Sequence, residues 1–87
     1  MSYETLMEFP CEFPIKMMGH DTPDFHAAAR AIVEKHTGPL EDVAIKSAQS
    51  RNGRFVSITV TVSAESREQL DNIYRDLTAH DDVLMAL

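Results

Sequence analysis

Residues 55–63, Phe-Val-Ser-Ile-Thr-Val-Thr-Val-Ser, alternate β-branched apolar side chains with mostly hydroxyl side chains. Successive side chains of a strand point to opposite faces of a sheet, so this pattern gives one apolar face and one mostly polar face. Strands of this kind are typical of antiparallel sheets covered on a single side, because buried parallel strands are apolar on both faces. The stretch therefore predicts a central antiparallel strand, covered by elements from elsewhere in the chain.

Two segments carry the start signals and the periodicity of helices. Residues 22–24 supply a threonine N-cap, a proline at the first helical position and an acid in the first turn, and glycine and proline at 38–39 end the segment. Ser66 and Gln69 have the spacing of a capping box, and apolar residues follow at i, i+3, i+4 and i+7. The sequence predicts a helix from Pro23 and a second helix that ends near residues 78–80.

Weaker alternation predicts three further strands. Residues 11–18 form the first, residues 43–48 form an edge strand whose Lys46 discourages foreign pairing, and residues 82–87 are apolar enough for the last. Asn52-Gly53 is a strong hairpin signal, because both residues tolerate positive φ. We expect a tight hairpin turn there, between the second and third strands.

The resulting element order is βαββαβ, an α+β class. Right-handed crossovers then place both helices on one face of a four-stranded antiparallel sheet with strand order 4-1-3-2, the ferredoxin-like sandwich. Strands two and four become exposed edges. With 87 residues there is room for one core, so we assign residues 1–10 to an N-terminal arm and residues 11–87 to a single ferredoxin-like domain.

Charge and composition limit the partners that this chain can have. A formal net charge of −6 argues against nucleic acid, because affinity for a phosphate backbone comes from clustered Lys and Arg. Phe55 lies where RNA-binding modules of this fold carry a stacking aromatic, but the rest of that signature is replaced, so RNA binding is a weaker alternative. No apolar run approaches a membrane span and the first residues do not have the pattern of a signal peptide, so we expect a soluble cytoplasmic protein.

The sequence predicts no metal, no cofactor and no catalytic residue. Cys11 stands beside Glu12 without a base to activate it, and the hydroxyl residues of the central strand also have no base placed near them. Other groups that could bind metal have no spacing that brings two or three together: His20, Asp21, His26, His36, His80, Asp81 and Asp82.

One ligand-binding segment is predicted in the loop between the first strand and the first helix, formed by Met18, Gly19, His20 and Asp21. This segment precedes a helix N-terminus, whose backbone N–H groups favour a carboxylate. Gly19 would let a ligand approach the backbone, and His20 would add a hydrogen-bond donor. A simple capped turn without a ligand is the alternative interpretation.

A second candidate site is an interface between copies of the chain. The unpaired backbone of an edge strand can template another strand, and exposed side chains of the second and third strands would flank that contact. These candidate interface residues are Ala44, Lys46, Ala48 and Phe55. They predict self-association into a homo-oligomer.

Short motifs from about Leu6 to Leu87 carry a family resemblance. They are Glu8-Phe9-Pro10, Met18-Gly19, Ser57 and Thr59, Glu68-Gln69, Ile73-Tyr74, Leu77 and the ending Val83-x-Met85-x-Leu87. In this combination the chain resembles the YbeD-like family of small bacterial proteins. The resemblance implies a ferredoxin-like fold similar to ACT-type regulatory domains, which bind amino acids and control enzymes. It also implies a cytoplasmic protein often encoded beside lipoate-attachment enzymes, and no established catalytic residues.

Three functions are compatible with these observations. A non-catalytic regulatory or adaptor module is favoured, because the fold leaves one sheet face free and no nucleophile is paired with a base. A sensor for an amino acid or another carboxylate is the sharper alternative, and a small enzyme comes last. The expected partner is another protein, for which the resemblance suggests an enzyme of lipoate metabolism.

Overall fold

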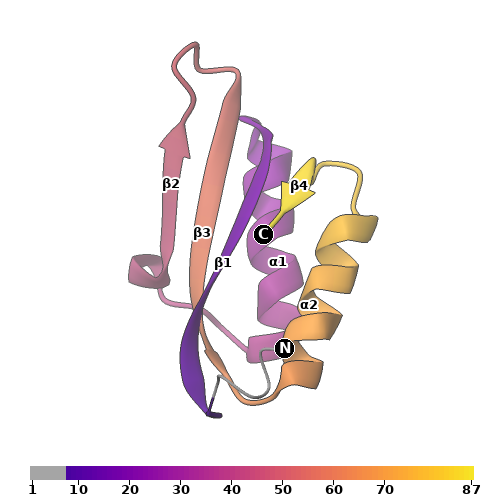
Figure 1. Cartoon of the computed structure of the whole chain (residues 1–87). Coiled ribbons are helices and arrows are strands. Elements are labelled where there is room, and N and C mark those ends of the chain that lie inside the picture. Colours follow the sequence, from indigo (N-terminus) through magenta and orange to yellow (C-terminus); the bar gives the residue numbers. More distant parts are fainter. Residues whose placement is uncertain (1–7) are drawn as a thin grey trace.

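The computed structural model describes residues 8–87. The elements follow in the order β1 (Cys11–His20), α1 (Pro23–Thr37), the 3₁₀ helix η2 (Asp42–Ala44), β2 (Ile45–Gln49), β3 (Phe55–Ala64), α2 (Arg67–Ala79) and β4 (Met85–Ala86). The sheet order is β2-β3-β1-β4 with antiparallel neighbours, and both helices pack on the same face (Figure 1). The predicted ferredoxin-like fold and its strand order, 4-1-3-2, are confirmed.

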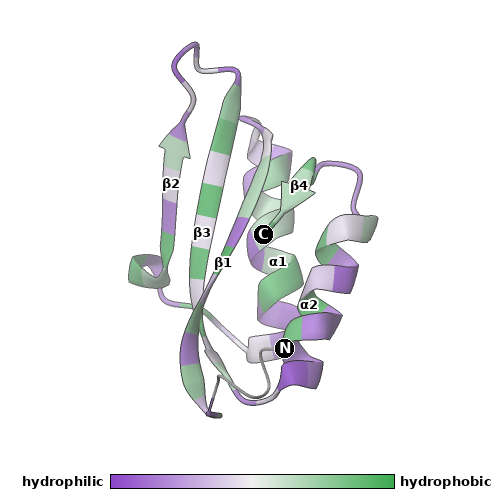
Figure 2. Ribbon diagram, viewed as in Figure 1, coloured by the Kyte–Doolittle hydropathy of each residue, from purple (hydrophilic) through white to green (hydrophobic). Residues whose placement is uncertain are grey.

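The core lies between the helices and the apolar face of β3 and β1. Along β3 buried residues alternate with half-buried ones, which appears as alternating green and pale bands in Figure 2. The largest fully buried side chains come from both layers: Ile15, Met17, Phe25, Val33, Val56, Ile58, Val60, Val62, Leu70, Ile73 and Leu77. Of the predicted arm, residues 1–7 lie outside the described residues, and Phe9 packs against this core.

Both predicted helix starts are confirmed by their capping bonds. The Thr22 hydroxyl accepts a hydrogen bond from the Phe25 amide at 3.1 Å, and the Ser66 hydroxyl accepts one from the Gln69 amide at 3.1 Å. The Gln69 side chain accepts from the amide of Glu65, one residue before the cap. These bonds satisfy N–H groups that have no partner inside a helix, and so they fix where each helix begins.

The strands differ in extent from the prediction because pairing, rather than local alternation, sets their ends. β1 continues to His20, since it pairs with β3 as far as His20 opposite Phe55. Residues 42–44 form η2 instead of the start of β2, with Arg30 donating to the Leu40 carbonyl at 2.6 Å and to Asp42 at 2.9 Å. β4 is shorter than predicted, because residues 80–83 turn before the chain joins the sheet.

The hairpin predicted at Asn52-Gly53 does join β2 to β3, but its loop is longer than the predicted tight turn. Gly53 has φ 73°, but within residues 8–87 only glycines have positive φ, so Asn52 does not share that conformation. Instead the loop spans residues 50–54: the Ser50 carbonyl accepts from the Gly53 amide at 2.9 Å, and the Asn52 side chain accepts from the Arg54 amide at 3.0 Å. Asn52 therefore serves as a hydrogen-bond acceptor, and only Gly53 supplies the left-handed residue.

We predict that Gly53→Val lowers the free energy of unfolding by about 1–2 kcal/mol, because a β-branched residue is strained in the left-handed region. Arg51→Val is the matched control, since it places the same side chain in the same loop at negative φ. Urea unfolding of both variants measures the difference. Equal midpoints for the two would contradict the assignment of Gly53 as the turn-forming residue.

Candidate functional site

The predicted ligand segment is the end of a strand rather than a loop. Because β1 runs to His20, Met18 and His20 point to the sheet face opposite the helices, and Gly19 points toward them. A Cβ on Gly19 would lie 2.5 Å from the Asp82 carbonyl oxygen and 2.9 Å from the ring of Phe25. The close approach that this glycine permits is therefore made by the chain itself, which packs its own backbone and a core ring there.

The start of α1 is also occupied by groups of the protein. Thr22 caps the helix, Pro23 has no N–H to offer, and Asp24 adds a negative charge in the first turn. Asp21 accepts hydrogen bonds from His26 at 2.8 Å and from the Gln49 side chain, and these bonds hold the pKa of Asp21 below its ordinary value. Two carboxylates near this helix end oppose an anionic ligand, so the geometry gives carboxylate binding no support, and that role stays a prediction.

The sheet face opposite the helices, here called the open face, brings together side chains from all four strands. The register places Met85, Met18, Ser57 and Ala48 side by side across the sheet, a line that we call the Met18 row. Met85 is 51% exposed, although large apolar side chains are usually covered. Beside this row the rings of His20 and Phe55 lie 4.9 Å apart, centroid to centroid, with 31° between their planes.

A hollow of about 170 Å³ opens on this face near the β2–β3 hairpin. Side chains of the Met18 row and Phe55 contribute to its walls, together with residues at the end of β2: Met18, Ala48, Gln49, Ser50, Phe55 and Ser57. Small-molecule sites usually measure about 300–1,000 Å³, so this hollow matches one side chain better than a whole ligand.

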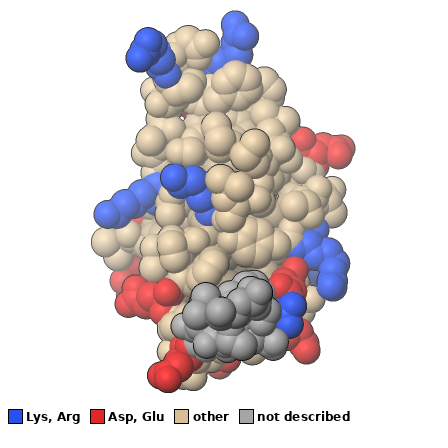
Figure 3. Space-filling view, viewed as in Figure 1, with Lys and Arg blue, Asp and Glu red and all other residues tan. Residues whose placement is uncertain are grey.

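The next line of residues along the strands is basic. Lys16 and Lys46 both stand opposite Thr59, in what we call the lysine row, and both are exposed. Arg51 and Arg54 lie in the adjacent hairpin loop. In Figure 3 the hairpin end of the molecule shows basic and uncharged residues, and most of the visible acidic residues lie toward the other end. Apart from Glu12 at the far end of β1, the charged side chains that the register places on the open face are basic, in a chain whose net charge is −6.

Three of the four predicted interface residues lie together on or beside the open face. Lys46, Ala48 and Phe55 belong to β2 and β3, whereas Ala44 lies in η2, before the strand begins. Self-association through these residues stays a prediction. Sequence reasoning missed the parts of the face contributed by Met18 and His20, which were assigned to a loop. Continuing the alternation of residues 11–18 for two more positions would have placed both on the same face as Lys16.

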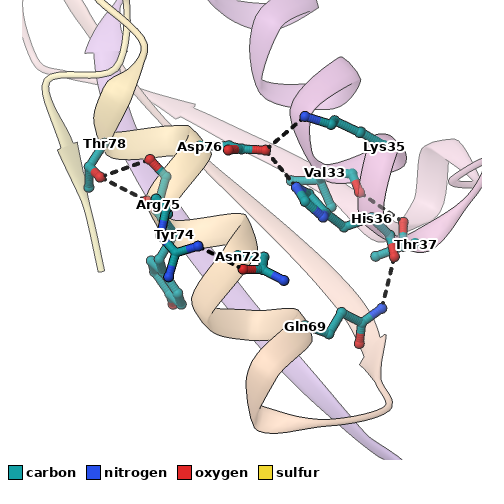
Figure 4. Close-up of polar contacts among 10 residues, drawn as sticks. All are labelled: Val33, Lys35, His36, Thr37, Gln69, Asn72, Tyr74, Arg75, Asp76 and Thr78. Carbon is teal, nitrogen blue, oxygen red and sulfur yellow. Dashed lines mark hydrogen bonds and ion pairs between the residues drawn. The ribbon is translucent and has the colours of Figure 1, made fainter.

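A second polar cluster joins the two helices (Figure 4). His36 Nε2 donates to the Asp76 carboxylate at 2.7 Å, Lys35 donates to the same carboxylate at 3.3 Å, and the Gln69 side chain donates to the His36 carbonyl at 3.0 Å. A histidine beside an aspartate can activate a hydroxyl, but here Thr37 donates its own hydroxyl to the Val33 carbonyl at 3.2 Å. The cluster fastens α1 to α2.

The remaining candidate metal-binding and nucleophilic residues do not form a site within the described part of the chain. Over residues 8–87, no group of three or more His, Cys, Asp or Glu side chains could hold a metal ion. Cys11 is half-buried and packs against the core at the start of β1. None of the helices in this part of the chain is long and apolar enough to cross a membrane.

Comparison with known proteins places the chain in a bacterial family. Residues 4–87 match the family described as "Protein of unknown function (DUF493)". The chain belongs to this family. A UPF0250 protein of Chromobacterium violaceum is 44% identical over 97% of this chain and 94% of its own length, and one of Nitrosomonas europaea is 40% identical over the whole length of both. The predicted resemblance to a family of small bacterial proteins is confirmed.

The fold of this chain also matches a solved structure. The solution structure of protein HP0495 from H. pylori superposes with a TM-score of 0.70, over 100% of this chain and 94% of that one. The two sequences are 18% identical, so this likeness concerns the fold alone.

The helix-joining cluster predicts a specific pH dependence. Hydrogen bonds from His36 and then Lys35 hold the pKa of Asp76 below its ordinary value of 3.8. Its stabilising contribution is therefore complete above that ordinary value and is lost as the pH falls through the lower folded-state pKa. We expect Asp76→Asn to unfold at lower urea than the natural protein at neutral pH, and to lose less stability between about pH 5 and pH 2.

The control is Asp81→Asn, which neutralises an exposed carboxylate outside the cluster. Urea unfolding midpoints measured across the acid range should follow the natural protein for this control. Asp21 and Glu34 also have lowered pKa values, so the acid-induced loss should become shallower in Asp76→Asn without disappearing. Superimposable acid profiles for all three proteins would contradict the role of Asp76.

Proposed function

We propose that this protein is a non-catalytic regulatory or adaptor module of the bacterial cytoplasm, and that it binds a protein partner through the open face of its sheet. The observation that carries the proposal is the Met18 row beside the His20 and Phe55 rings. Exposed apolar side chains gathered on one face are typical of protein contact sites, and Met85 on this face is 51% exposed.

Two features of the hollow support a protein partner over a free small molecule. Its volume of about 170 Å³ would bury little of a drug-sized ligand, whereas partner proteins commonly insert one anchoring side chain into a pocket of this kind. Its walls also extend into the mostly apolar Met18 row, which a larger surface could cover at the same time. A sensor of amino acids or other carboxylates is therefore the second candidate, with the start of α1 as its predicted site.

The non-catalytic part of the proposal rests on how the polar groups are used. The two His–Asp pairs, His26 with Asp21 and His36 with Asp76, connect elements of the fold, and among residues 8–87 neither has a hydroxyl or thiol hydrogen-bonded to its histidine. General base catalysis needs the base within hydrogen-bond reach of the proton that it removes. The family resemblance implies a fold similar to ACT-type domains, which likewise bind ligands and regulate enzymes without catalysing a reaction themselves.

The test compares two alanines in the full-length protein. Ala48 on the open face and Ala31 on α1 are both exposed, so Ala48→Arg and Ala31→Arg add the same side chain to opposite sides of the molecule. We expect both variants to melt within a few degrees of the natural protein, since surface changes usually alter stability little. Proteins that co-purify from a lysate of the source bacterium should be lost with Ala48→Arg and retained with Ala31→Arg.

The result against the proposal is equal retention of every co-purified protein by the two variants. A purified lipoate-attachment enzyme is the first partner to test directly, because the family resemblance links these proteins to such enzymes. If no complex forms, the lipoate-attachment enzyme is excluded as the partner. The comparison of Ala48→Arg with Ala31→Arg would still decide whether the open face binds another protein.

A further inference from the structure

We infer that the open face receives an acidic protein segment that inserts one apolar side chain into the hollow. This inference rests on the proposed function and names the chemistry of the partner. The first observation is an uneven use of the eight basic residues. On or beside the helices, Arg30, Lys35 and Arg67 form ion pairs with carboxylates, and Arg75 donates to Asn72.

Within the described residues, the other four basic side chains have neither an ion pair nor a side-chain hydrogen bond: Lys16, Lys46, Arg51 and Arg54. They lie on the open face or in the hairpin beside it, in a chain that has 14 acidic residues with which to pair them. Uncompensated charge of one sign on one face attracts a surface of the opposite sign and speeds its association. This face is therefore complementary to carboxylates supplied from outside.

The spacing of the two rows defines what such a segment must carry. The lysine row and the Met18 row are two residues apart on each strand, which is about 7 Å along the sheet. An extended segment places its own side chains i and i+2 on one side, again about 7 Å apart. A segment lying along the strands can therefore insert an apolar residue near Ala48 while an acidic residue two positions away meets Lys16 or Lys46.

The opposite direction along the strands leads to the hairpin. Beyond the Met18 row lie His20 and Phe55, and then Arg54 in the loop. An acidic residue on the other side of the apolar anchor would approach this basic end. The pattern that fits the face is therefore acidic, any residue, apolar, any residue, acidic, with further acidic residues toward the hairpin.

Two other occupants fit the same face less well. A nucleic acid would be repelled by the net charge of −6, and the ring of Phe55 is already in contact with the tilted ring of His20, so it is not a free platform for a base. A second copy of the chain, docked with its own open face, would bring four unpaired basic residues against the same four. The acidic segment is favoured because its carboxylates compensate the basic residues of the face while its apolar side chain fills the hollow.

The experiment titrates the isotope-labelled full-length protein with a short synthetic peptide, Asp-Glu-Ser-Leu-Ser-Glu-Asp, blocked at both ends. We expect NMR shift changes confined to the Met18 row, Phe55 and the lysine row. The dissociation constant should rise about tenfold between roughly 50 mM and 500 mM NaCl, because exposed charges are screened by salt. A peptide with lysine in place of every acid, and one with glycine in place of leucine, are the ligand controls and should bind at least about tenfold more weakly.

Matched protein variants separate local contact from overall charge. Lys46→Glu on the open face and Arg75→Glu on α2 change the net charge equally, and both positions are exposed. Lys46→Glu should weaken peptide binding about tenfold, and Arg75→Glu should change it less than about twofold. Equal weakening by the two variants, equal binding of the lysine peptide, or shift changes away from the open face would overturn the inference.

The remaining outcomes separate this inference from the proposed function. If a partner depends on Ala48 but its binding is unaffected by Lys46→Glu and by salt, the adaptor function stands and the acidic segment is wrong. If single-stranded oligouridine binds the face more tightly than the acidic peptide, or if the protein dimerises through it in light scattering, the face has another occupant and the inference is again overturned.

Discussion

The long antiparallel pairing between β1 and β3 determines the rest of the structure. The register runs unbroken from Cys11 opposite Ala64 to His20 opposite Phe55. Because side chains alternate along both strands, this one register decides which residues face the helices and which face outward, and a slip by one position would exchange the two sets. The core and the open face are therefore two results of the same pairing.

This dependence explains what the sequence could predict. The β3 pattern is strict enough to define its buried face without knowledge of its neighbours, and the helix caps at Thr22 and Ser66 are local hydrogen bonds that short motifs encode. Strand ends were harder to predict, because they depend on residues far apart in the chain. His20 belongs to β1 only because Phe55 lies opposite, and η2 precedes β2 in a segment held to α1 by Arg30.

The candidate site was less predictable than the fold for a related reason. Gly19 suggested a backbone open to a ligand, yet its missing side chain makes room for the Asp82 carbonyl and the ring of Phe25. Nothing near Gly19 in the sequence indicates that a turn some sixty residues later will lie there. Pairing with β3 keeps β1 extended through His20, which turns Met18 and His20 toward the open face. The residues chosen for a loop site are thus divided between the core and the opposite surface.

The two faces also differ in how their residues contribute to stability. Charged residues on the helix side make contacts that stabilise the fold, whereas the exposed residues of the open face contribute little to it. The His36 and Asp76 pair joins the helices, and Arg30 with Glu34 secures the connection to β2, so the charges on that side are used in the structure. Lys16 and Lys46 have no such partners in the part of the chain that the structure describes, and exposed basic residues contribute little to stability. Met85, 51% exposed, forgoes about half of the free energy that full burial would supply. Folding accounts for the composition of the helix-covered side, whereas folding does not require the exposed methionine and the lysines of the open face, and the proposed binding role would explain them.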